Sequence, residues 1–189
     1  MIGWMVDDVE GTQQLLQFDP KGILYRLVAS YKMAVCGLLI FHPKVNLIKS
    51  DPVGFASTEY GAIEFDPKDL IENVRKENLK LAQVTDSLTY MLINSAYEAC
   101  LAKYGESKWR TLREKHHELE FFRHIRNAAS HGGFFTFKQN EPNPKRIAIW
   151  RGRQITQELR GKTLWDANLQ PGDSLVFLWD IEQILKAYP

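Results

Sequence analysis

Three neighbouring residues carry side chains that together could act on a phosphodiester. Arg126 and Asn127 are adjacent, and His131 follows Asn127 by four residues, which places those two on one face of a helix. An imidazole ionises near neutral pH and can move protons, and a guanidinium can hold two phosphate oxygens at once. RNA can be cut without metal because its own 2′-OH is an internal nucleophile, provided that proton transfer and developing charge are assisted. The three residues therefore suit chemistry on a phosphodiester, with His131 in acid–base catalysis, Arg126 stabilising the phosphorane and Asn127 aligning the reacting groups.

The residues around this motif predict an amphipathic helix that positions it. Apolar side chains recur at helical spacing, namely Leu119, Phe122, Ile125, Ala128 and Ala129. Gly132 follows at the position where a left-handed residue ends a helix. The motif thus belongs to the last turns of a helix that ends at His131. A helix C-terminus carries partial negative charge, which favours a protonated His131 and repels phosphate, so that Arg126 must compensate.

A purely structural interpretation remains open beside the catalytic one. Arg126 and His131 could simply complement the helix dipole and bond its free carbonyl groups. Ala128, Ala129 and Ser130 are small and would let a second helix approach closely. That helix could belong to a second copy of the chain or to the same chain.

The string Arg126-Asn127-Ala128-Ala129-Ser130-His131 resembles the Arg-x4–6-His motif of HEPN domains, and the resemblance extends over about residues 19–132. It implies an antiparallel helical bundle that dimerises and places two copies of the motif at the interface. It also implies a metal-independent endoribonuclease that acts as a toxin or defence effector and leaves 2′,3′-cyclic phosphate and 5′-OH ends. RNA, a second copy of the chain and a cognate inhibitor or antitoxin protein are the partners that follow from it.

Length and composition favour a single domain over residues 1–189, with a helical body at 19–132 and a hairpin and C-terminal helix as an appendage at 133–189. The formal net charge is +1, so any surface for nucleic acid must be a local patch. The longest apolar run, 33–41, is too short to cross a bilayer and begins too deep in the chain for a signal peptide. Cys36 and Cys100 fall in apolar helical segments, which favours free thiols and a cytoplasmic protein.

The fold class that these patterns predict is mainly α. Start signals at Asp19-Pro20 and Asp66-Pro67, and a stop at Gly105, predict helices over 19–41 and from 66 to about 104. A third helix should run without interruption from a cap at Ser107 to His131 and form an antiparallel hairpin with the helix before it. The long connection at 42–65 could contain short extended pieces.

After Gly133 the pattern changes to shorter elements. Phe134–Phe137 could form a short strand, and 147–156 should form a β-hairpin that turns at Arg151-Gly152-Arg153. A last helix should follow, capped by Asp173 or Ser174.

Basic residues in this region, with aromatic residues among them, predict contacts to RNA. The candidates are Lys145, Arg146, Arg151 and Arg153, whose charges suit phosphate groups, while the aromatic rings suit base stacking. The alternative is a solvated hairpin whose aromatic residues pack on the bundle.

The histidine-rich segment before the motif offers a weaker possibility. His116, His117, Glu120 and His124 include pairs four residues apart, but a metal site usually needs ligands from a second element, and none is evident. We therefore expect no metal and no cofactor, and we expect these residues to line a solvated face or the rim of the motif. The leading function is a metal-independent endoribonuclease; the alternatives are a non-catalytic HEPN-like module that binds a partner protein or a nucleotide, and a helical dimerisation domain.

Overall fold

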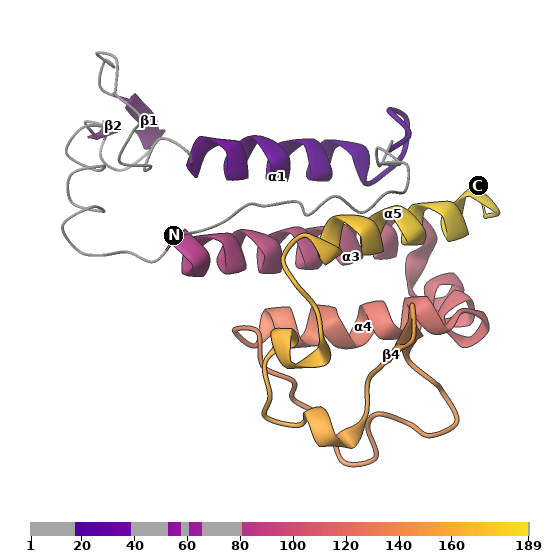
Figure 1. Cartoon of the computed structure of the whole chain (residues 1–189). Coiled ribbons are helices and arrows are strands. Elements are labelled where there is room, and N and C mark those ends of the chain that lie inside the picture. The colour runs from indigo at the N-terminus through magenta and orange to yellow at the C-terminus, as the bar shows by residue number, and fades with distance from the viewer. Residues whose placement is uncertain (1–17, 39–52, 58–60, 66–80, 189) are drawn as a thin grey trace, which may run out of the picture.

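The computed structural model describes residues 18–38, 53–57, 61–65 and 81–188 of the chain. Its described part is mainly helical, with small two-stranded antiparallel sheets (Figure 1). No helix in this part is both long and apolar enough to cross a membrane.

The first helix, α1, spans Tyr25–Gly37 and begins later than the sequence suggested. The backbone N–H groups of Lys21 and Gly22 donate to Asp19, at 2.9 and 2.7 Å. Asp19 therefore starts a turn that precedes the helix, and it does not cap the helix itself. The predicted end of this helix near residue 41 lies outside the described residues.

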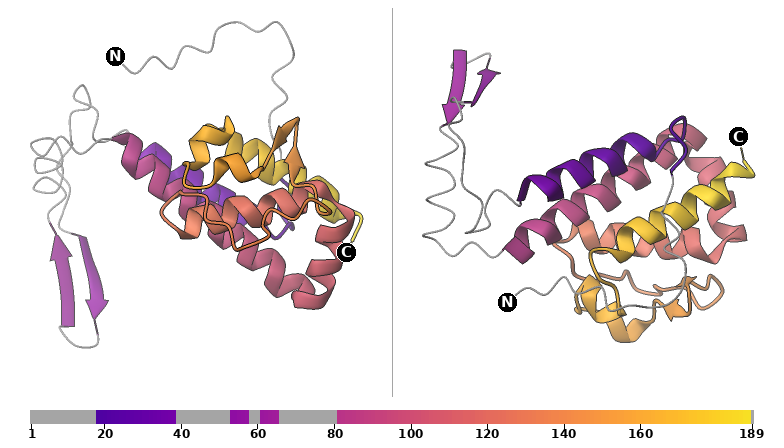
Figure 2. Two further views of the ribbon diagram at one scale, coloured as in Figure 1. Left: turned by 90° about the horizontal axis from the view of Figure 1, so that it is seen from below. Right: turned by 45° about the horizontal axis from the view of Figure 1, so that its top comes forward.

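Strands β1 (Val53–Ser57) and β2 (Gly61–Phe65) pair antiparallel, with Val53 opposite Phe65. They are the short extended pieces expected within the 42–65 connection, and Figure 2 draws them as a separate hairpin. The predicted helix start at Asp66-Pro67 lies outside the described residues.

Helices α3 (Leu81–Lys115) and α4 (His117–Ser130) form the centre of the fold. Asn94 and Glu98 of α3 contact Ser130 and Arg126 of α4, respectively. Position numbers thus rise along one helix as they fall along the other, which confirms the antiparallel arrangement.

Two interruptions separate these helices into three segments. Gly105 has φ 72° and ψ 157°, a conformation that suits glycine, so the predicted break there is confirmed. The uninterrupted helix predicted over 107–131 is wrong, because His116 is extended at φ −126° and ψ 117°. Its imidazole Nε2 lies 2.8 Å from the hydroxyl of Tyr188, and its carbonyl accepts the N–H of Leu119. These contacts satisfy polar groups of His116 where the helical hydrogen bonding is interrupted. The interruption allows α4 to fold back along α3.

Residues 133–172 wrap around α4 as short elements (Figure 1). They include β3 (Ile149–Trp150) and β4 (Arg153–Gln154), together with the 3₁₀ turns η2 (Gln157–Leu159) and η3 (Leu164–Ala167). The predicted hairpin is confirmed, although its turn is the pair Arg151-Gly152, both with positive φ. The predicted strand at 134–137 is reduced to a single bridge between Phe134 and Thr163.

The last helix, α5, spans Asp173–Lys186, with Gly172 at its N-cap. The predicted N-cap at Asp173 or Ser174 is wrong. The carboxylate of Asp173 accepts the N–H of Gln170, three residues earlier, and the hydroxyl of Ser174 donates to the carbonyl of Pro171. Both side chains therefore stabilise the preceding turn.

One cluster of buried side chains joins the helical body to the later segments. Phe177 of α5 lies between Phe121 and Phe122 of α4 and Trp150 of β3, with ring centroids 5.2 to 5.6 Å apart. Burying such rings is strongly favourable, so residues beyond 133 contribute to the same core as the helices. This packing fixes α4, and with it the motif at its end.

Candidate functional site

The end of α4 is a glycine-terminated helix C-terminus. Its C-cap residue is His131, and Gly132 follows with φ 69°. The N–H of Gly133 donates to the carbonyl of Ala128 at 2.8 Å, which is the long bond of a Schellman motif. The predicted role of Gly132 as the left-handed residue that ends the helix is therefore confirmed.

Gly133 fixes this end against α3. Its φ is 88°, and a Cβ there would lie 2.2 Å from the hydroxyl oxygen of Tyr90. The ring of Tyr90 in turn stacks on Trp165 at 5.8 Å between centroids. The absence of a side chain at Gly133 lets this aromatic pair pack directly against the backbone that follows His131.

Arg126 is held by groups from both helices. Its Nη1 donates to Oδ1 of Asn127 at 3.3 Å, its Nη2 lies 2.5 Å from Oε1 of Glu98, and its guanidinium lies over the ring of Tyr97 at 5.5 Å. The side chain of Arg126 is 33% exposed and that of Glu98 is 51% exposed. A phosphate could reach this guanidinium, but it would compete with Glu98.

His131 is exposed, and its imidazole makes no hydrogen bond or ion pair with any described residue. Among the predicted catalytic residues, the structure brings Arg126 and Asn127 into contact and leaves His131 open to solvent at the helix end. An exposed imidazole is accessible to an incoming group, with which it can exchange a proton.

The small residues of the motif are used within the chain. Ala128 is fully buried and Ala129 is 6% exposed, so they support the intrachain packing alternative and carry no argument for a second copy. Ser130 is exposed and donates its hydroxyl to Asn94 at 2.8 Å.

The segment that carries Lys145 and Arg146 lies at the other end of α4. His117, the first residue of α4, binds the carbonyl of Ile147 through Nδ1 at 3.1 Å. Since α4 has 14 residues, the segment at 145–147 and the motif are separated by roughly 20 Å along the helix. A single RNA strand would have to span this length to contact both.

Carboxylates already neutralise most of the predicted RNA-binding cations. Arg151 donates Nε and Nη2 to Asp180 at 2.7 and 3.0 Å, and this hydrogen bonding raises the pKa of the guanidinium. Arg153 donates to the carbonyl of Asn168 and lies 3.5 Å from Asp173.

Two further residues complete the basic surface. Arg146 lies 2.5 Å from Glu114, whereas Lys145 is exposed and forms no ion pair with any residue described. The aromatic residues of this region are mostly packed on the bundle, since Phe135, Phe137 and Trp150 are buried. Lys145 is therefore the hairpin cation most available to a phosphate.

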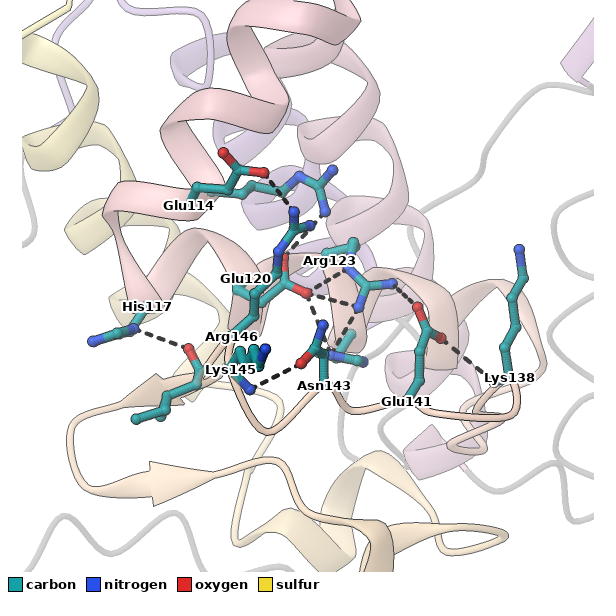
Figure 3. Close-up of polar contacts among 12 residues, drawn as sticks. Glu114, His117, Glu120, Arg123, Lys138, Glu141, Asn143, Lys145 and Arg146 are labelled. Atoms are coloured by element: carbon teal, nitrogen blue, oxygen red, sulfur yellow. Dashed lines mark hydrogen bonds and ion pairs between the residues drawn. The ribbon is translucent and has the colours of Figure 1, made fainter.

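A second cluster of ionisable groups was not predicted as such. Glu120 was expected on a solvated face or at the rim of the motif, but its side chain is only 2% exposed. It accepts hydrogen bonds from Arg113 Nη1 at 3.1 Å and from Arg123 Nε at 2.9 Å. Nη1 of Arg123 also donates a hydrogen bond to Oε1 of Glu141 at 2.8 Å (Figure 3). This network ties the 138–146 loop to α4.

His124 is buried within the same cluster. Arg123 Nη2 donates to its Nε2 at 3.0 Å, which requires that nitrogen to be unprotonated. Burial, and then the charge of Arg123, lower the pKa of His124 to about 4. The imidazole is therefore neutral near pH 7, and its 3.7 Å approach to Glu120 is not an ion pair.

The other polar residues of this segment have structural contacts as well. Figure 3 shows His117 directed at the carbonyl of Ile147, and His116 binds Tyr188. Within the described residues, no three histidine, cysteine, aspartate or glutamate side chains gather as a metal site would require.

The thiol of Cys100 is free and buried, and burial raises its pKa to about 12. Such a thiol is unreactive at neutral pH. Nothing is described of the side chain of Cys36.

Comparison with known proteins adds no assignment: no family model, no curated protein and no solved structure matches this chain.

Proposed function

We propose that this protein is a metal-independent endoribonuclease of the HEPN type, acting at the end of α4. The observation that carries the proposal is the exposed imidazole of His131 at a fixed helix end, five residues after a partly exposed Arg126 that is already oriented by Asn127. The activity is proposed because the spacing of Arg126 and His131 resembles the Arg-x4–6-His motif of HEPN ribonucleases.

The chemistry is an internal transesterification of RNA. His131 accepts the proton of a 2′-OH as that oxygen forms a bond to phosphorus, and the bond from phosphorus to the 5′-oxygen breaks. The leaving oxygen takes a proton from a protonated imidazole or from water, which yields a 2′,3′-cyclic phosphate and a 5′-OH. Arg126 leaves Glu98 and binds the phosphorane oxygens, whose charge exceeds that of the ground-state phosphate.

A homodimer is part of this proposal. In-line displacement benefits from groups on both the attacking and the leaving side, and a two-fold axis near residues 126–131 would supply a second Arg126 and His131. An inhibitory partner protein would act by covering the same surface, as expected of a toxin or defence effector.

The ion pair between Arg126 and Glu98, with Nη2 and Oε1 2.5 Å apart, favours a second candidate. A guanidinium neutralised within its own chain is less suited to phosphate, so the polar surface of Arg126, Asn127 and Ser130 could instead bind a partner protein or a nucleotide without catalysis.

A cleavage assay on mixed single-stranded RNA in EDTA separates the two candidates. The endoribonuclease should cut under these conditions, and His131→Ala and Arg126→Ala should each lose about 100-fold or more in rate. Ser130→Ala, at an exposed neighbouring position, is the matched control and should retain activity. Equal rates for the wild type and both motif variants would exclude the proposed site.

A further inference from the structure

The chain that leaves the motif is fixed by backbone hydrogen bonds. The N–H of Phe134 donates to the carbonyl of His131 at 3.4 Å, the N–H of Leu164 donates to the carbonyl of Gly133 at 2.7 Å, and Phe134 bridges to Thr163. The backbone at 134 and at 162–163 is therefore fixed close to that of His131.

Phe134 presents its ring to solvent in this fixed segment. It is 48% exposed, while Phe135 and Phe137 are 1% and 8% exposed. Successive side chains of an extended segment point to opposite faces, so the core uses the rings on one face and leaves Phe134 on the other. An aromatic ring that is exposed but held by its backbone can stack on a base with little loss of conformational entropy.

A cation lies on the neighbouring segment. The carbonyl of Lys162 accepts the N–H of Phe135 at 2.8 Å, and the Lys162 side chain is exposed and forms no ion pair with the residues that the structure describes. The nearby carboxylate of Asp166 is engaged by the backbone and hydroxyl of Thr163, at 2.7 and 2.9 Å. Hydrogen bonds from Thr163, and then the charge of Lys162, lower the pKa of Asp166, so Lys162 faces one nearby carboxylate without the direct ion pair that the hairpin arginines make.

We propose that Phe134 and Lys162 form a contact surface for single-stranded RNA beside the motif. A base next to the scissile phosphate stacks on the ring of Phe134, and the ammonium group of Lys162 binds a backbone phosphate of the same strand. The inference rests on the proposed function, because it takes His131 as the centre of the reaction. It gives the enzyme unpaired RNA as its substrate, since a base within a duplex has no free face to offer a protein side chain.

Binding can be measured without cleavage on a fluorescein-labelled 2′-O-methyl hexauridylate, in which the nucleophilic hydroxyl is blocked. Phe134→Ala should weaken its binding to the full-length protein roughly 5- to 100-fold in fluorescence anisotropy, whereas Phe134→Tyr should bind like the wild type. The matched control Ile147→Ala removes another exposed apolar side chain, 44% exposed, at the far end of α4 and should change nothing.

The charge is tested over a salt series with the same probe. Lys162→Gln should lower the slope of log K against log salt by about 0.7, and Lys108→Gln, an exposed lysine of α3, should leave it unchanged. Circular dichroism of each variant verifies that the fold is retained.

The outcomes separate this inference from the proposed function. If natural RNA is cleaved but Phe134→Ala binds the probe as the wild type does, the contact surface is wrong and the catalytic proposal stands. If Phe134→Ala weakens binding but natural RNA is not cleaved, the surface stands and the catalytic proposal fails. A wild-type protein that does not bind the probe contradicts the contact surface, and the cleavage assay on natural RNA decides the catalytic proposal separately.

Discussion

Replacing Glu120 by glutamine should destabilise the protein far more than replacing an exposed glutamate in a still shorter ion pair. The substitution keeps the shape of the side chain and removes its charge. Arg113 and Arg123, which are 13% and 17% exposed, would then share one neutral acceptor in a region with little access to water.

The magnitude follows from burial. Removing one partner of a buried ion pair typically costs about 3–5 kcal/mol, because the remaining charge is left uncompensated. Arg123 keeps Glu141 at 2.8 Å, so we expect about 3 kcal/mol, at the lower end of that range. Glu98 pairs with Arg126 at 2.5 Å but is 51% exposed, and such surface pairs contribute at most about 1 kcal/mol.

Urea unfolding followed by circular dichroism measures the difference. With a slope of about 2 kcal/mol per molar urea, Glu120→Gln should lower the midpoint by about 1.5 M. The matched control, Glu98→Gln, should lower it by less than about 0.5 M. Equal midpoints for the two variants would show that burial does not govern the contribution of the Glu120 network, and the reasoning would be refuted.

Three further predictions concern pH, the helix end and the basic hairpin. Burial, and then Arg123, hold the pKa of His124 at about 4, below the value near 6.5 of the unfolded chain; the unfolded chain therefore binds more protons between these values, and stability should fall as pH is lowered from about 7 to 4. A smaller fall in the urea midpoint of His124→Gln over that range checks this, and an identical fall would contradict it. Gly132→Ala introduces a side chain at φ 69° with no atom within 4 Å of its Cβ, so only backbone strain of about 1 kcal/mol should appear, as a melting temperature lower by about 2–4 °C; an unchanged melting temperature would mean that the helix end relaxes. With RNA long enough to span α4, Lys145→Ala should reduce the salt slope of binding more than Arg151→Ala, whose guanidinium is engaged within the chain; the reverse order would mean that the paired arginine is released to RNA.

The parts of the fold that were predicted correctly depend on local signals. The apolar spacing from Leu119 to Ala129 identified the buried face of α4, and each of its members is indeed buried. Gly132 and the turn at Arg151-Gly152-Arg153 were recognised by their glycines, which adopt a positive φ without strain. The positive φ of Arg151 itself has no such signal in the sequence.

The errors arose where a distant residue decides the local structure. At the helix break, His116 binds Tyr188, 72 positions later. No glycine, proline or capping pattern beside His116 predicts the break. Glu120 and His124 are typical of a solvated helix face, and they are buried because Arg113 and Glu141 approach from other segments. The three-residue spacing of Glu120 and Arg123 was the available signal for this network, but such pairs are usually exposed.

Residues 128–133 at the end of α4 are subject to two kinds of selection, one for packing and one for any activity of the motif. Ala128 must stay small because it is fully buried, and Gly133 must lack a side chain because Tyr90 occupies that space. The imidazole of His131 makes no hydrogen bond or ion pair with the described residues. A lineage that kept the fold but lost any activity of the motif would therefore retain Ala128 and Gly133 while position 131 drifted freely.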